Sequence, residues 1–193
     1  MGGFLNQWLE EVAKPSVRAR TFSSYSQMIR DLVAPELGSI RLAKLIPSDV
    51  QRLMSRKLEA GLSPRSVTYL RQVLRTALGR ALKWGLVNRN VAALTDSPKV
   101  KRYEITPLSP DEARTFLATV ENDRLYALFV VALTTGLREG ELLGLAWADV
   151  DLDRAQARVR QQLQRLAGRL QLTEPKTSAS STWSPWPRWR WRL

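Results

Sequence analysis

Five positively charged side chains share one face of a predicted helix and could bind phosphate groups. The helix covers residues 64–84: Ser63 has the side chain of an N-cap, Pro64 suits the first helical position, and Gly85 follows the last periodic residue. At about 100° per residue, apolar side chains fill one arc of this helix. The opposite arc carries the cations Arg65, Arg71, Arg75, Arg80 and Lys83 and no acidic residue. A face with a single sign of charge favours contacts with the phosphates of nucleic acid over simple solvation.

The whole chain is basic, and its first half most of all. The 193 residues contain 30 Lys and Arg against 18 Asp and Glu, a net charge of +12. Residues 1–100 hold 16 of the basic and 7 of the acidic side chains, and so carry +9 of that charge. An excess this large implies a polyanionic partner, and nucleic acid is the first candidate.

The composition also excludes several classes of function. Cysteine and histidine are both absent, so zinc sites with thiolate or imidazole ligands, disulfides, a cysteine nucleophile and a Ser-His-Asp triad are ruled out. No uninterrupted apolar run approaches about 18 residues, and the N-terminus lacks a basic region followed by an apolar one. We therefore expect a cytoplasmic protein with no membrane contact and no small-molecule substrate.

The first half is predicted to be almost entirely helical. Apolar residues at helical spacing, with proline and glycine as stop signals, indicate three further helices before the basic one. They run from Phe4 to Ala13 with a stop near Pro15, from behind Thr21 to Leu32 with an end before Pro35, and from Pro47 to Leu58 with Gly61 as the C-terminal stop.

A basic linker over residues 98–106 leads to a second domain. It contains the cations Lys99, Lys101 and Arg102. Beyond it, Ser109 and Glu112 have the spacing of a capping box, which predicts a helix start. Further elements are expected at Leu125–Leu133 (helix), Glu139–Leu145 (short helix), and Ala157–Leu163 with Leu170–Leu172 around Gly168 (β-hairpin). The expected fold is therefore mainly α with two domains, the second mixing helix and sheet.

Two segments of the second domain resemble motifs of a known family. TTGLREGELLGLAWADVDL, from Thr134 to Leu152, is similar to the first catalytic box of the tyrosine recombinases, the phage integrase family. EPKT, from Glu174 to Thr177, is similar to their catalytic lysine turn. The resemblance covers roughly residues 4–180. It implies a SAM-like helical core-binding domain at residues 1–97, a partial α+β catalytic domain at residues 107–180, and duplex DNA clamped between the two.

The resemblance assigns Arg138 and Lys176 as catalytic residues. Arg138 would bind two nonbridging phosphate oxygens through paired guanidinium donors as negative charge develops during phosphoryl transfer. Lys176 would reach the leaving 5′ oxygen through the minor groove and give it a proton. Such a mechanism requires no metal and no other cofactor. Glu139 and Glu141, on the same short helix, are interpreted as solvating that helix and positioning the arginine.

The chain departs from the family pattern in the rest of the active site. That site also uses a His-x-x-Arg box, a later His or Trp, and a C-terminal tyrosine nucleophile. The chain has no histidine, and its last tyrosine, Tyr126, precedes Arg138. We interpret Tyr25, Tyr69 and Tyr103 as packing or surface residues. The expected chain is therefore catalytically incomplete and would need a nucleophile from another chain.

Four of the seven tryptophans stand in the last eleven residues, interleaved with proline and arginine. Such a segment could lie at an anionic membrane interface or stack on single-stranded bases, although its prolines prevent a continuous helix. We prefer a frameshift, because reading one base earlier turns each Trp codon into one for Leu, Val or Met. On this hypothesis residues 181–193 are disordered, and the other frame encodes a hydrophobic strand, a His-x-x-Arg box and a tyrosine.

Two functions remain open at this point. The chain is either a DNA-binding site-specific recombinase with part of its catalytic site, or a non-catalytic helical regulator that competes for recombination sites or pairs with intact recombinase protomers. A pseudogene product is a third outcome, since half a catalytic domain leaves an exposed apolar surface and an unpaired sheet edge. The expected ligand of either functional product is double-stranded DNA.

Overall fold

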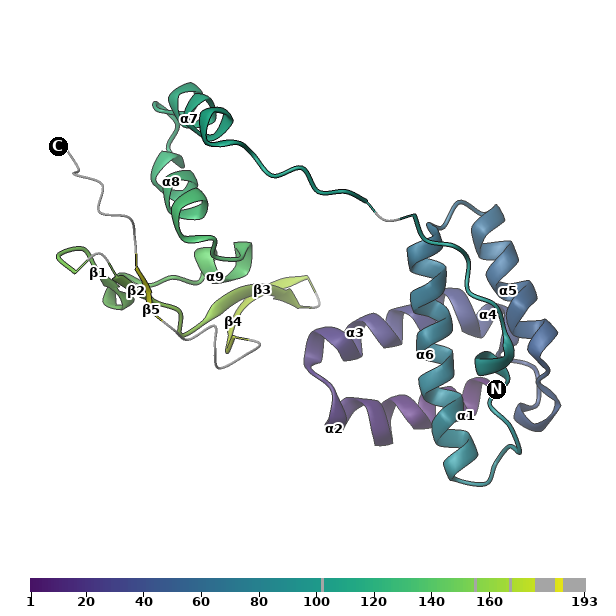
Figure 1. Ribbon diagram of the computed structural model, residues 1–193. Coiled ribbons are helices and arrows are strands. Elements are labelled where there is room, and N and C mark those ends of the chain that lie inside the picture. The colour runs from purple at the N-terminus through teal and green to yellow at the C-terminus, as the bar shows by residue number, and fades with distance from the viewer. Residues whose placement is uncertain (102, 155, 167, 176–182, 186–193) are drawn as a thin grey trace. The chain divides into compact units, whose positions relative to one another are not determined.

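The structure is a computed structural model of the chain, and it describes every residue except 102, 155, 167, 176–182 and 186–193. The chain forms two compact units, Met1–Tyr103 and Glu104–Leu193 (Figure 1). The first is built from helices, and the described part of the second combines helices with short strands. The predicted two-domain, mainly helical fold is confirmed, and the division between the units falls inside the predicted linker.

The first unit contains four long helical segments and two short 3-10 turns. The elements are α1 (Gly2–Trp8), η1 (Leu9–Ala13), α2 (Lys14–Ser16), α3 (Ala19–Met28), η2 (Ile29–Val33), α4 (Ala34–Leu37), η3 (Leu42–Lys44), α5 (Pro47–Glu59), α6 (Pro64–Lys83) and η4 (Val91–Leu94). The segments α1-η1-α2 and α3-η2-α4 are each continuous in the chain. Figure 1 shows α6 crossing the hairpin that these two segments form.

Proline does not end the second helical segment, so the predicted end before Pro35 is wrong. A π-helical turn precedes the proline in both segments: Lys14 donates its backbone N–H to the carbonyl of Leu9, and Ala34 donates to the carbonyl of Ile29. Proline lacks an N–H, and its ring clashes with the carbonyl four residues back in a regular α-helix. The wider turn accommodates the ring. The second segment also begins at Ala19, before the predicted start behind Thr21.

A single hydrophobic core fills the first unit. The predicted apolar arc of α6 is buried, and Val73 belongs to it as well. Trp8 of α1 is 2% exposed and stacks on Tyr25 of α3, with ring centroids 5.7 Å apart. After α6 the chain folds back, and η4 buries Val91 and Ala92 against this core. The short helix η4 was not predicted.

The ends of α5 and α6 agree with the sequence signals. Gly61 and Gly85 adopt left-handed conformations with φ of 89° and 72°. In each case the next residue donates its N–H back into the helix, from Leu62 to Lys57 and from Leu86 to Ala81. Ser63 caps the start of α6 by accepting from the N–H of Ser66 at 3.2 Å. Glycine is needed at positions 61 and 85 because other residues avoid positive φ.

The second unit carries its helices first and its strands afterwards. The elements are α7 (Pro110–Thr119), α8 (Tyr126–Thr135), α9 (Glu139–Leu143), η5 (Trp147–Asp149), β1 (Val150–Asp151), β2 (Gln156–Arg158), β3 (Gln162–Leu166), β4 (Arg169–Thr173) and β5 (Trp183–Pro185). The capping box is confirmed: Ser109 N donates to Glu112 Oε2 at 2.8 Å, and Glu112 N donates to Ser109 Oγ at 3.3 Å. The third helix ends at Leu143, before the predicted Leu145.

The strands form two sheets, which corrects the predicted hairpin. The hairpin pairs β3 with β4 from Gln162↔Thr173 to Leu166↔Arg169, and Gly168 in its turn has a φ of 81°. The stretch before it does not belong to the hairpin, because β2 pairs with β1 and β5 in a separate sheet of order β1-β2-β5. Alternation of apolar and polar residues marked strands here but could not assign their partners.

The last described segment of the chain is also a strand. Trp183–Pro185 pairs antiparallel with β2, with Ala157 opposite Ser184. The expectation of an unstructured tail over residues 181–193 is therefore wrong for these three residues, and the others in that range lie outside the described part of the chain. Among the described residues, no helix combines the length and hydrophobicity needed to cross a membrane.

Candidate functional site

The exposed face of α6 carries the largest set of predicted binding residues. Arg65, Arg75 and Lys83 are exposed, and Arg80 is half-buried. The sequence has no acidic residue between Glu59 and Asp96, so no carboxylate on the helix offsets these charges. The predicted cationic face is thus present at the surface, with the exception of Arg71.

A groove runs beside this face, between α6 and the hairpin of helical segments. Its volume is about 540 Å³, and its lining combines an apolar floor with polar and cationic walls. The floor and walls include Trp8, Val12, Ala13, Ser16, Tyr25, Gln72, Arg75, Thr76, Gly79, Arg80 and Lys83. Three cations and no carboxylate line it, so the groove favours an anionic ligand.

Arg71 takes part in contacts within the unit. Its guanidinium donates to Thr95 Oγ1 at 3.0 Å, to Ser97 Oγ at 3.3 Å and to the carbonyl of Ala93 at 3.4 Å. Thr95 is only 6% exposed. Arg71 therefore ties the segment after η4 to α6, a role that its position among surface arginines did not indicate.

The linker cations fall partly within the described residues. Lys99 and Lys101 are exposed. Arg102 lies outside the described residues. The two described lysines extend the cationic surface along the chain beyond η4.

Two of the tyrosines pack at the edge of the groove. Tyr25 lies between Trp8 and Tyr69, and its ring centroid is 6.2 Å from that of Tyr69. Burial raises the pKa of Tyr69 above its ordinary value, and Tyr25 raises it further. A phenol with a raised pKa stays protonated, which agrees with the interpretation of these residues as packing residues.

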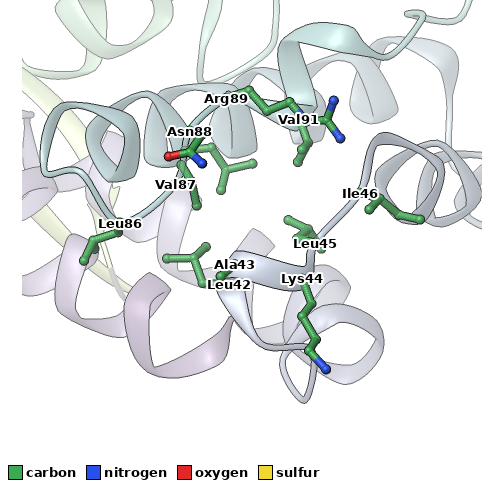
Figure 2. Close-up of a pocket in the computed structure, with 11 residues that line it drawn as sticks. Leu42, Ala43, Lys44, Leu45, Ile46, Leu86, Val87, Asn88, Arg89 and Val91 are labelled. Carbon is green, nitrogen blue, oxygen red and sulfur yellow. The ribbon is translucent and has the colours of Figure 1, made fainter.

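A second pocket of the first unit has a different character (Figure 2). It encloses about 490 Å³, and aliphatic side chains from residues 42–46 and 86–91 make most of its lining. Lys44 and Arg89 are its charged residues, and no carboxylate lines it. Leu78, from the buried side of α6, also contributes, and the lining shares no residue with the cationic face. The lining offers no acid–base pair for catalysis.

Arg138 of the second unit is held by a neighbouring carboxylate. It stands at the N-cap of α9, directly after the turn at Gly136, whose φ is 65°. Glu141 accepts from the Arg138 backbone N–H at 3.1 Å and from Nη1 at 2.8 Å. The carboxylate side chain is 6% exposed, and that of the arginine is 75% exposed. Glu141 thus orients a guanidinium that remains at the surface, as the sequence analysis proposed for this acid.

Two glycines bring α9 against the hairpin strand β3. A Cβ on Gly140 would lie 2.9 Å from the carbonyl oxygen of Leu163, and one on Gly144 would lie 2.7 Å from Gln162 Cα. These residues are four apart and so share one face of the helix. The GELLG segment is therefore a close packing surface that fixes Arg138 relative to β3.

Two glutamine side chains, one in β3 and one just before it, bind backbone carbonyls of the C-cap glycine of α9 and of the segment after β4. Gln161 Nε2 donates to the carbonyl of Gly144 at 3.0 Å. Gln162, 7% exposed, donates to the carbonyl of Glu174 at 2.7 Å. The segment that leads to the predicted lysine is thus anchored on the strand that packs against α9. Lys176 itself lies outside the described residues.

Two parts of this site were missed by sequence reasoning, the close-packing glycine pair and Gln162. The four-residue spacing of Gly140 and Gly144 was an available signal for the first. Gln162 gave no signal.

No group of three or more described Asp or Glu residues is arranged to hold a metal ion.

Family models match both units of the chain. The model described as phage integrase, N-terminal SAM-like domain, matches residues 2–58. The model of the phage integrase family matches residues 107–184.

Curated relatives and solved structures are similar over most of the chain. An integrase of Saccharopolyspora erythraea is 29% identical over 84% of this chain and 38% of its own length. A XerC-like tyrosine recombinase of Caldanaerobacter subterraneus is 28% identical over 86% of this chain and 44% of its own. The Tn1549 transposon integrase in complex with a circular intermediate DNA superposes with a TM-score of 0.82 and 25% identity, over 96% of this chain and 60% of that one. A lambda integrase dimer bound to a core site has the same fold, with a TM-score of 0.69, 20% identity and coverage of 89% and 61%. The chain spans less than half the length of these curated relatives.

Proposed function

Because the chain belongs to the phage integrase family of tyrosine recombinases, we propose that it binds double-stranded DNA through its first unit and takes part in site-specific recombination. The solved integrases that it resembles are complexes with DNA, which supports duplex DNA as the ligand. The SAM-like first domain and the partial catalytic second domain correspond to two parts of one recombinase.

The observation that carries this proposal is the cationic, acid-free face of α6 beside its groove. Arg75, Arg80 and Lys83 line the groove together, and Arg65 extends the charge toward the start of the helix. Each cation that neutralises a phosphate releases a counterion from DNA, so the affinity depends steeply on salt.

Duplex binding measured by fluorescence anisotropy across a salt series tests the proposal. The association constant should fall steeply, with a slope of about −0.9 per phosphate contact in a double-logarithmic plot. The double variant Arg75→Glu and Lys83→Glu should bind far more weakly. Arg71 is left unchanged because its contacts with Thr95 and Ser97 are part of the fold.

The matched control is the double reversal Arg41→Glu and Lys44→Glu. Both residues are exposed in the same unit, and the net charge changes equally. Lys44 lines the pocket of Figure 2, whose lining shares no residue with the cationic face. Equal losses in the two double variants, or binding that ignores salt, would show that this face is not the contact.

For the second unit we propose that Arg138 binds the scissile phosphate and that Lys176 protonates the leaving oxygen. The exposed guanidinium, oriented by Glu141, supports the first role. For the second role, the support is the anchoring by Gln162 of the Glu174 carbonyl, in the segment that leads to Lys176. The 193-residue chain has no tyrosine after Tyr126, so it should form no covalent adduct with a 3′ phosphate. An adduct on a cognate duplex, seen as a shifted band in a denaturing gel, would disprove the prediction that no covalent adduct forms.

The same exposed cations of α6 would also serve a second candidate, a regulator that occupies recombination sites or pairs with intact recombinase protomers. Addition of the chain to an intact family member and its site separates the two. A regulator should change the cleavage by the intact enzyme in proportion to its own concentration. Unchanged cleavage at saturating amounts of the chain would rule this function out.

A further inference from the structure

The middle of the exposed face of α6 is not cationic. Thr68, Gln72 and Thr76 follow one another at four-residue spacing and so form one ridge along the helix. Gln72 and Thr76 are exposed, and Thr68 is half-buried. Because successive members turn by about 40° around the axis, the ridge crosses the face obliquely with Gln72 at its centre.

Four cations of α6 flank this ridge, and Gln72 and Thr76 also line the groove beside Trp8 and Tyr25. Arg65 and Lys83 lie toward the two ends of the helix, while Arg75 and Arg80 lie to either side of Gln72 at about 100° per residue. Phosphates bound by such a frame would place a groove of the duplex over the ridge. The major groove, about 12 Å wide, admits an α-helix.

The threonines present methyl groups rather than hydroxyls for contact. Thr68 Oγ1 donates to the carbonyl of Pro64 at 2.9 Å, and Thr76 Oγ1 donates to the carbonyl of Gln72 at 2.9 Å. Each hydroxyl is thereby turned onto its own helix, which leaves the methyl as the outward group. The ridge thus consists of one amide between two methyl groups.

Resting on the proposed DNA binding, we infer that α6 reads base sequence in the major groove through Gln72, with an adenine as its target. The amide donates and accepts in the pattern of adenine N7 and N6, and a threonine methyl matches the C5 methyl of thymine. The surrounding cations contact phosphates, which are alike at every base pair. Specificity at the centre of this face therefore falls to Gln72.

Selection from a random duplex library, with the full chain and three variants, tests the inference. The wild-type chain should select a site containing an A·T pair at which Gln72→Ala loses preference by about 5- to 150-fold, since a bidentate contact discriminates by that factor. Affinity for bulk duplex should change by less than about twofold because no cation is removed. Gln72→Glu should shift the preference at the same pair toward cytosine, whose N4 donates to a carboxylate.

Gln7→Ala is the matched control, since Gln7 is exposed on α1 and contacts Glu11. It should select the wild-type site. Thermal unfolding confirms the fold of each variant, and alanine at an exposed helical position favours the helix. If Gln72→Ala selects the same site as Gln7→Ala, or if the wild type binds all duplexes equally, the inference is overturned while salt-dependent binding leaves the proposed function standing. A wild-type chain that binds no duplex refutes both.

Discussion

Replacing Gly144 with alanine should separate α9 from β3 and loosen the segment that carries Arg138. A Cβ at position 144 would lie 2.7 Å from Gln162 Cα, 2.9 Å from the carbonyl oxygen of Gln161 and 2.9 Å from the amide nitrogen of Leu163. All three are backbone atoms, so no side-chain rotation relieves the overlap. The helix and the strand must move apart.

Overpacking of this kind costs about 1–3 kcal/mol. Separation also strains the hydrogen bond from Gln161 Nε2 to the carbonyl of Gly144, whose loss would cost about 1 kcal/mol more. In a unit of this size each kcal/mol lowers the Tm by about 4–8 °C. We therefore expect the overpacking alone to lower the Tm of the second unit by roughly 4–24 °C, with the first unit unchanged.

Hydrogen–deuterium exchange read by mass spectrometry localises the effect. Amides of residues 139–144 and 162–166 should exchange about 5- to 150-fold faster in Gly144→Ala, the factor that corresponds to the same free energy. Gly79→Ala is the control: it is interior to α6, and its nearest neighbour atom would be Asn90 Nδ2 at 3.6 Å. That variant should instead stabilise its helix by about 0.5–1 kcal/mol. Wild-type protection of α9 and β3 in Gly144→Ala would refute the close-packing argument.

Two further predictions concern the first unit. Glu36 accepts from Lys57 Nζ at 2.6 Å, and this contact, together with Arg56, lowers the pKa of the Glu36 carboxyl below 4.5. A carboxyl whose pKa is lower in the folded state stabilises the fold above pH 4.5. This stabilisation is lost as the pH falls through the folded pKa. Glu36→Gln should therefore lower the Tm at pH 7 but progressively less in acid, and a Tm difference independent of pH would contradict this. Arg71→Ala should speed amide exchange over residues 91–97 and cost about 1–3 kcal/mol, because it leaves the buried hydroxyl of Thr95 without its charged donor. Arg71→Lys, which keeps the charge but not the planar fork, should recover little, and full recovery would show that charge alone matters.

The helices of the first unit were predictable where local signals agreed. For α6, the N-cap Ser63, the apolar arc and the glycine after Trp84 all specify the same helix, and the structure follows them. At Pro35 the local rule failed, because the chain admits a π-helical turn that keeps the helix continuous. Helix propensity describes a residue in a regular α-helix. Whether the backbone can form a π-helical turn before a proline depends on the whole segment.

The sequence motif singled out Arg138 as a candidate, but several contacts around it could not be predicted from the motif. Its placement depends on the close approach of α9 to β3, which glycines at positions 140 and 144 permit. The strand β2 was placed in a hairpin because its alternation resembles that of β3, whereas its partners are β1 and β5. The position of Arg71 in the helix predicts a surface cation. In the structure its guanidinium instead donates to acceptors 22–26 residues later in the chain. Contacts between distant segments decide each of these cases.

Hydrophobic burial is divided very unequally between the two units. The core of the first unit contains 22 buried hydrophobic residues, whereas Ala157 and Val159 are the buried hydrophobic residues of the described part of the second. The helix α8 is apolar around its whole circumference, yet none of its residues is buried. Local opening is easiest where buried apolar contacts are few. Native-state exchange should therefore reach the amides of the described part of the second unit before those of the core helices of the first.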